Sequence, residues 1–128
     1  DALPISVRAH RHTMHMTGSE VFKFATRTVV KSCAKVLGDA GLSVADVDLF
    51  VPHQANIRII EWAARRLGFD ERQVFANLDR YGNTSCASIP LCLHEACQTG
   101  RLKKGDTLLM AGFGSGLTWG SCLTRWEL

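Results

Sequence analysis

The fold of this chain is decided by the stretch Val51-Pro52-His53-Gln54-Ala55-Asn56-Ile57-Arg58-Ile59-Ile60. It overlaps the end of an apolar run, residues 47–51, that has the length of a buried strand. Pro52 ends that strand, because its ring removes a donor from the hydrogen-bonded ladder. Apolar residues then recur at helical spacing over residues 56–67. The corner between strand and helix is therefore expected at His53.

Outward from this corner, strands and helices alternate. A helix is predicted from Ser19 to Leu37, where Gly38 and Gly41 end it. The further elements expected are a short strand with a loop within 1–18, one helical turn over 43–46, a strand over 74–78, a helix over 85–99, and strands over 107–113 and 117–126. Because a Gly-Ser-Gly turn joins the last two strands, the pattern predicts a layered α/β domain with a mixed sheet that closes in a C-terminal hairpin.

Composition narrows the class of protein. The 128 residues are enough for one domain with a sizeable core, and 46% hydrophobic and 21% charged residues are ordinary for a globular protein. No window reaches the apolar length of a membrane-spanning helix. The net charge of +3 is spread along the chain, whereas nucleic-acid binding usually requires a dense basic stripe. We therefore expect no membrane and no nucleic acid, and an acidic protein partner fits the mild basic excess.

The cysteines and tryptophans are expected to be structural. An odd number of cysteines without a CxxC pair indicates reduced, mostly buried thiols and a cytoplasmic location. These cysteines are Cys33, Cys86, Cys92, Cys97 and Cys122. The tryptophans Trp62, Trp119 and Trp126 are expected to pack rather than to bind a cofactor.

Polar and glycine-rich segments follow three of the expected strands. His53 follows the first, Asn83 the second, and Gly114-Ser115-Gly116 the third. Ligands of open α/β sheets gather outside the carboxyl ends of strands, so these segments are expected to converge on one pocket. An imidazole and an amide aimed at one point can stabilise a negative oxygen. Taken singly, each has a plainer interpretation: a structural histidine, a turn asparagine and a hairpin turn.

A histidine cluster and one cysteine offer alternative sites for chemistry. His10, His12 and His15 lie within six positions, but their spacing fits no standard zinc site, and we expect no metal. Cys86 is expected in the first turn of a helix, where the dipole lowers the pKa of a thiol, and it competes as a nucleophile. Packing is the favoured interpretation of Cys86.

Separate motifs in one order carry a resemblance to a known family. They are Gly18-Ser19-Glu20-Val21-Phe22-Lys23-Phe24-Ala25, the Pro-His-Gln-Ala-Asn-x-Arg-Ile run from Pro52, Gly82-Asn83-Thr84-Ser85, and Gly116-Leu117-Thr118-Trp119-Gly120. Together they resemble the C-terminal half of β-ketoacyl-acyl-carrier-protein synthase III, a condensing enzyme of the thiolase-like superfamily. The resemblance runs essentially from end to end.

This resemblance implies an architecture and partners. It implies a thiolase-like half-domain with a mixed, mostly parallel five-stranded sheet, helices packed on it and a closing hairpin. Residues 1–128 are then the C-terminal domain, and the N-terminal half, which bears the nucleophilic cysteine in this family, is absent. The resemblance also implies a homodimer when complete, no cofactor, and an isolated chain that exposes apolar surface meant for its other half.

The resemblance further implies a reaction and roles for individual residues. The family condenses an acyl-CoA primer with malonyl-acyl-carrier protein, releasing CO₂ and CoA. His53 and Asn83 match the residues that bind the malonyl thioester and stabilise its enolate. The loop Gly114-Ser115-Gly116 matches the backbone donors of a second oxyanion hole, although many members have glycine where this chain has Ser115.

The resemblance assigns lesser roles to three more residues. Phe113 matches an aromatic residue that lines the site, Asn56 is expected in the pocket where it fixes the His53 corner, and Arg58 matches a residue that meets the carrier protein.

Two other functions stay open on the sequence. One is a condensing enzyme of secondary metabolism with the same chemistry but other acyl groups. The other is a scaffold domain that has kept the fold without catalysis. For residues 1–128 alone we expect no condensation, since none of their cysteines occupies the nucleophile position of the family.

Overall fold

The computed structural model describes residues 7, 9–10, 12 and 16–128. The short strand expected near the start of the chain lies outside these residues. The elements in chain order are α2 (Gly18–Asp39), η1 (Val44–Asp46), β1 (Leu49–Pro52), α3 (Ile57–Leu67), η2 (Glu71–Gln73), α4 (Leu78–Tyr81), η3 (Ser85–Ala87), α5 (Ser88–Gln98), β2 (Thr107–Gly114) and β3 (Thr118–Arg125).

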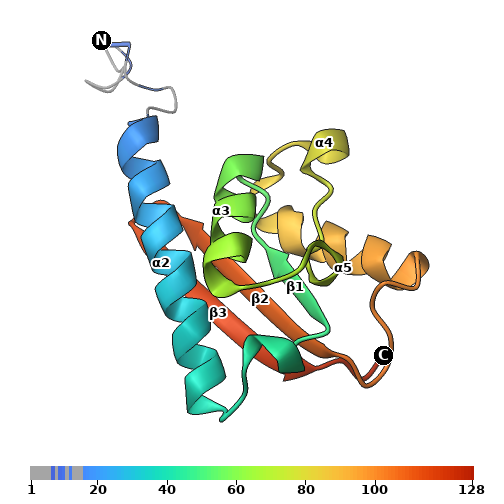
Figure 1. Ribbon diagram of the computed structural model, residues 1–128. Coiled ribbons are helices and arrows are strands. Elements are labelled where there is room, and N and C mark those ends of the chain that lie inside the picture. The colour runs from blue at the N-terminus through green and yellow to red at the C-terminus, as the bar shows by residue number, and fades with distance from the viewer. Residues whose placement is uncertain (1–6, 8, 11, 13–15) are drawn as a thin grey trace.

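The described sheet is mixed and has three strands in the order β1-β2-β3 (Figure 1). β1 pairs with β2 in parallel, with Leu49 opposite Leu108. β2 pairs with β3 antiparallel, and the pair Gly114 and Thr118 closes the predicted hairpin. Helices on a mixed sheet with a closing hairpin are confirmed, whereas the prediction of five mostly parallel strands is wrong for the described part of the chain.

The strand expected over residues 74–78 is reduced to a single contact. Val74 forms one parallel bridge with Phe50, and the N–H of Phe75 donates to the Phe50 carbonyl at 2.9 Å. The chain then leaves the sheet, because the carbonyl of Asn77 accepts the N–H groups of Arg80 and Tyr81 at 3.1 and 3.2 Å. These bonds start the short helix α4, which takes the place of the end of the expected strand.

Helices cover both faces of the sheet, and the alternation of side chains along the strands explains why (Figure 1). Phe50 and Leu109 face α2 and α3, in a core that also holds Cys33 and Ala63. On the other face, Leu49, Val51 and Leu108 pack against Cys92 and Ala96 of α5. Burying a large apolar side chain in this way stabilises the fold by roughly 1.5–3 kcal/mol.

Local signals set the ends of the two helices on the first face. Asn56 caps α3, its side-chain oxygen accepting the N–H of Arg58 at 2.9 Å, and Gly68 ends the helix with φ +91°. α2 runs two residues beyond the predicted end, to Asp39. Of the two glycines expected to end it, Gly41 alone adopts a left-handed conformation (φ +68°). Gly38 lies inside the helix rather than ending it.

Several predictions about burial need correction. All five cysteines are free thiols, but only Cys33 and Cys92 are buried, so the expectation of mostly buried cysteines is wrong. Trp119 is 58% exposed, and its ring meets that of Phe24 edge-on with 5.7 Å between the centroids. None of the described helices is both long and apolar enough to cross a lipid bilayer.

Candidate active site

A groove of about 1160 Å³ opens at the carboxyl ends of β1 and β2. It runs from the start of α2 past the β1–α3 corner to the segment before α5 and the β2–β3 turn. The predicted pocket residues all line it, namely His53, Asn56, Asn83, Phe113, Gly114, Ser115 and Gly116. The convergence of these segments on one cavity is thus present in the structure.

His53 sits directly after β1 and is half-buried. The backbone N–H of His53 donates to the backbone carbonyl of Ala111 at 2.7 Å, which continues the β1–β2 ladder to the rim of the groove. Its ring meets Phe113 edge to face, with 5.4 Å between centroids. Burial lowers the pKa of the imidazole below its usual value. At neutral pH the ring is therefore uncharged, with one N–H to donate and one nitrogen to accept.

Asn83 reaches the groove by a route that differs from the prediction. It follows the helix α4 rather than a strand, after Gly82 in a left-handed conformation (φ +66°). Its Oδ1 accepts the N–H of Ser85 at 3.0 Å. Because this bond occupies the carbonyl of the side chain, the Nδ2 group is the part of the amide that is left to donate to a ligand.

The turn between β2 and β3 requires glycine at one position. Gly116 has φ +141°, and a Cβ there would lie 2.7 Å from Cγ2 of Thr118. The Gly116–Leu117 peptide bond is cis. Ser115 has no left-handed conformation, and its carbonyl accepts the hydroxyl of Thr118 at 3.1 Å. The turn therefore accommodates the side chain of Ser115 without a left-handed backbone at that position.

The other predicted site residues divide between the groove and the surface. Asn56 lines the groove and also caps α3. Arg58 is exposed on the first turn of α3 and does not line the groove.

Cys86 differs from its favoured interpretation. It lies in the 3₁₀ turn η3 rather than in an α-helix, and it is exposed and lines the groove, so a packing role is wrong.

Sequence reasoning missed an apolar part of the groove. Met16, Phe22, Ile89, Leu117 and Trp119 line it. Leu117 and Trp119 lie in the motif Gly116–Gly120, and Phe22 lies in the motif that begins at Gly18, so their places in these motifs are the signal that could have found them. Met16 and Ile89 carry no signal of their own in the sequence.

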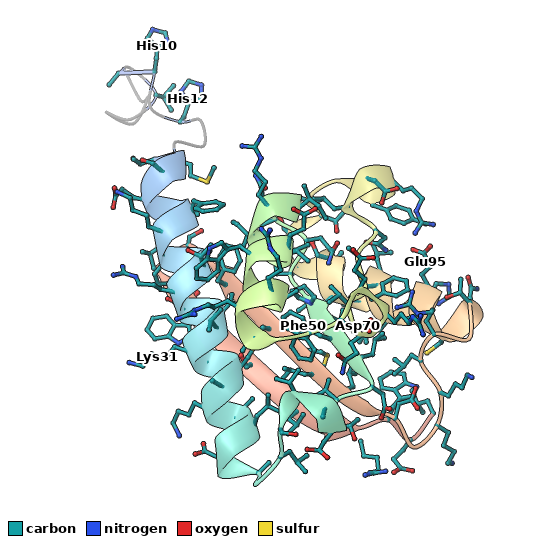
Figure 2. All side chains as sticks on the ribbon, viewed as in Figure 1. His10, His12, Lys31, Phe50, Asp70 and Glu95 are labelled. Atoms are coloured by element: carbon teal, nitrogen blue, oxygen red, sulfur yellow. The ribbon has the colours of Figure 1, made fainter. Side chains whose placement is uncertain are left out.

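The described histidines near the N-terminus form no metal site. Figure 2 shows His10 and His12 beyond the N-terminal end of α2, away from the sheet. Among the described residues, no cluster of three histidine, cysteine or carboxylate side chains is placed to hold a metal ion. His15 lies outside the described residues.

Comparison with known families gives the site a context. Residues 37–126 match the family of the C-terminal region of 3-oxoacyl-[acyl-carrier-protein] synthase III. The chain belongs to this family. The resemblance drawn from the motifs is thereby confirmed.

Synthases III of known sequence match nearly the whole chain. The β-ketoacyl-[acyl-carrier-protein] synthase III of Desulfitobacterium hafniense (strain DSM 10664 / DCB-2) is 53% identical over 95% of the chain and 37% of its own length. That of Clostridioides difficile (strain 630) is 49% identical over 96% of the chain and 38% of its own length. The chain thus spans less than two-fifths of these synthases III.

Solved structures confirm the fold class. The 3-oxoacyl-[acyl-carrier-protein] synthase III from Aquifex aeolicus VF5 superimposes with a TM-score of 0.86 at 48% identity, covering 88% of this chain and 36% of that one. The priming β-ketosynthase of the R1128 polyketide biosynthetic pathway gives a TM-score of 0.80 at 39% identity, covering 89% and 35%. The described domain therefore has the thiolase-like fold of the synthase III family.

Proposed function

We propose that this chain supplies the enolate-stabilising part of the active site of a β-ketoacyl-acyl-carrier-protein synthase III. The observation that carries the proposal is the meeting of His53 and Asn83 in one groove, each with a donor left for a ligand. Its relatives bear that enzyme name. The reaction is the decarboxylative condensation of an acyl-CoA primer with malonyl-acyl-carrier protein.

The proposed role of His53 and Asn83 is to hold the carbonyl oxygen of the malonyl thioester. When the bond to the carboxylate breaks, CO₂ leaves and the electron pair of that bond forms the enolate, whose negative oxygen accepts both donors. The enolate carbon then attacks the acyl thioester on the enzyme, a carbon–carbon bond forms, and the cysteine leaves as thiolate. Each donor to the developing charge contributes about 3–4 kcal/mol to lowering the barrier.

The backbone of Gly114-Ser115-Gly116 is proposed to stabilise the second negative oxygen, which forms when the enolate attacks. Its N–H groups belong to a turn whose conformation requires Gly116, so they are held in place before substrate binds. Phe113 packs against the His53 ring and shields this end of the groove.

The complete enzyme is proposed to contain further parts. An N-terminal half supplies the nucleophilic cysteine, and residues 1–128 form the C-terminal domain of a cytoplasmic homodimer. Arg58, exposed beside the groove corner, is proposed to bind the acidic acyl carrier protein.

The decisive experiment compares His53→Ala and Asn83→Ala with the wild type in the complete enzyme. Each change should lower CO₂ release from malonyl-acyl-carrier protein by about 10²–10³-fold, because one donor to the enolate is lost. His94→Ala, at an exposed position on α5 that does not line the groove, is the matched control. Wild-type decarboxylation in either groove variant would refute the assignment.

A second candidate is priming in polyketide biosynthesis, favoured by the similarity to the R1128 priming β-ketosynthase. It uses the same donors with a different primer. A panel of acyl-CoA primers assayed with the complete enzyme separates the two functions. Fatty-acid initiation predicts condensation with the short primers that fatty-acid synthesis elongates, whereas polyketide priming predicts a preference for a different primer. The isolated 128-residue chain should show no condensation with any of them.

A further inference from the structure

Two buried amide side chains behind the groove join the segments that carry His53 and Asn83. Gln54 and Asn77 are each only 1% exposed, and neither lines the groove. We infer that Gln54 and Asn77 are positioning residues that set the placement of His53 relative to Asn83. This inference rests on the proposed function and names residues through which the two donors are aligned.

Gln54 ties down the corner from which His53 projects. Its Nε2 donates to the carbonyl of Pro52 at 2.8 Å, which bridges over His53 within the same corner. Its Oε1 accepts the backbone N–H of Asn77 at 3.1 Å. The Gln54 side chain therefore connects the residues that flank His53 to each other and to the segment that carries Asn77.

Asn77 carries this connection into α5. Its Oδ1 accepts the thiol of Cys92 at 3.0 Å, and its Nδ2 donates to Glu95 at 2.9 Å. Burial raises the pKa of Cys92 to about 11, so the thiol keeps the proton that it donates. Arg80 of α4 pairs with the other oxygen of Glu95 (labelled in Figure 2). Both polar atoms of the Asn77 side chain are thus engaged by α5.

The backbone of Asn77 then sets the position of Asn83. Its carbonyl accepts the N–H groups of Arg80 and Tyr81 and so starts α4. The N–H of Gly82 donates to the carbonyl of Leu78 at 2.8 Å, which closes the single turn of this helix. Asn83 is the next residue, so a shift of Asn77 is transmitted through one rigid turn to the Asn83 amide.

No other side chain makes this connection among the described residues. The bond from Asn77 N–H to Gln54 Oε1 is the one side-chain hydrogen bond there between the corner 52–56 and the segment 77–86. A displacement of about 1 Å between two groups that bind one oxygen can cost about 10²-fold in rate. Loss of the Gln54 side chain should therefore slow decarboxylation, because that step needs both His53 and Asn83.

The test replaces Gln54 by leucine in the complete enzyme and measures two half-reactions separately. Acyl transfer from acyl-CoA to the enzyme thiol, followed by mass spectrometry of the protein, does not use the His53–Asn83 pair. CO₂ release from malonyl-acyl-carrier protein does. We expect Gln54→Leu to slow decarboxylation by about 10–10²-fold while acyl transfer stays at the wild-type rate.

A matched glutamine at the other end of the sheet is the control. The side chain of Gln73 also forms hydrogen bonds to the backbone, donating to the carbonyls of Val44 and Val47 at 3.1 and 2.7 Å. Gln73→Leu removes a comparable structural contact far from the groove and should leave the ratio of the two half-reactions unchanged. Asn77→Ala keeps the backbone N–H that Gln54 binds and should give a smaller selective loss than Gln54→Leu.

Two results would overturn the inference. One is an equal loss in both half-reactions of Gln54→Leu, and the other is no loss in either. If that variant does not fold, the same two rates in Gln54→Met decide by the same criteria, because methionine has the length of glutamine without its hydrogen bonds. Adding Gln54→Leu to Asn83→Ala should cause little further loss of decarboxylation if Gln54 acts through Asn83. His53→Ala and Asn83→Ala, measured in parallel, show separately whether the proposed function itself holds.

Discussion

Beneath α2 and α3 the side chains are apolar and enclosed, whereas at the carboxyl ends of β1 and β2 polar groups face an open groove. Phe50 and Leu109 of the first region are 0% exposed. In the groove, His53 is half-buried, Asn83 is exposed, and Gly116 adopts a conformation that few other residues can. The first region stabilises the fold, and the second is the proposed binding site for a ligand. Changes in the two regions should therefore separate stability from activity.

The largest effect on stability is expected from Phe50→Ala. The Phe50 ring stacks on that of Phe69 with centroids 4.9 Å apart, inside the core below α2 and α3. Its loss should lower the free energy of unfolding by about 3–5 kcal/mol, since a cavity replaces the ring. Denaturant unfolding measures this. Decarboxylation per folded molecule should stay near the wild-type rate, and a selective loss of activity would break the separation of the two regions.

The groove should respond in the opposite way to Gly116→Ala. The new Cβ would meet Thr118, and the left-handed φ would be strained, at a cost of about 1–3 kcal/mol. Because the turn must shift, the rate of condensation per folded molecule should fall, in addition to the loss of folding free energy. Gly38→Ala is the control: it lies inside α2 with no atom within 4 Å of the new Cβ, and should raise stability by about 0.5–1 kcal/mol.

A smaller, pH-dependent effect is expected at His53. Burial lowers its pKa in the folded protein, while the unfolded chain keeps a value near 6.5. As the pH falls below that value, the unfolded state binds a proton that the folded state does not, so stability declines until the folded pKa is reached. Urea midpoints at about pH 7.5 and about pH 5.5 should show this decline. His53→Gln should lose less stability over the same interval, and identical declines would contradict burial as the cause.

The smallest effect is expected on the surface, outside both regions. Lys35 bonds Asp39 at 2.6 Å on α2, but their side chains are 72% and 63% exposed. Lys35→Ala should change the free energy of unfolding by at most about 0.5 kcal/mol, because water and salt screen such pairs. A larger change in the free energy of unfolding, measured with denaturant, would show that this surface of α2 contributes to stability as the packed core does.

The regular elements were predictable because their signals are local. The apolar stripe of residues 56–67 and the stop at Gly68 placed α3 within one residue of its bounds. The predicted strand over residues 74–78 failed because the backbone N–H of Asn77 donates to the side chain of the distant Gln54 and not to a neighbouring strand, while its backbone carbonyl starts α4. A sequence window shows the apolar run Val74-Phe75-Ala76 but not the partner that the following backbone finds.

The candidate site was predictable in part for the same reason. His53, Asn83 and Gly116 stand in short contiguous motifs, which are visible in the sequence, and they line one groove. Gln54 and Asn77 lie 23 positions apart, and nothing in their spacing predicts that one amide binds the backbone of the other. Buried polar contacts between distant segments depend on the folded geometry, so they become visible only in the structure.

The bond that occupies Oδ1 of Asn83 has a consequence for the choice of inhibitors. With Oδ1 held by the N–H of Ser85, the proposed site offers a ligand the Nδ2 donor of Asn83. A ligand atom placed there gains by carrying lone pairs and loses by carrying a hydrogen. Analogues that keep a carbonyl or alkoxide oxygen at this point should bind, while those with a methylene or an ammonium in its place should be rejected.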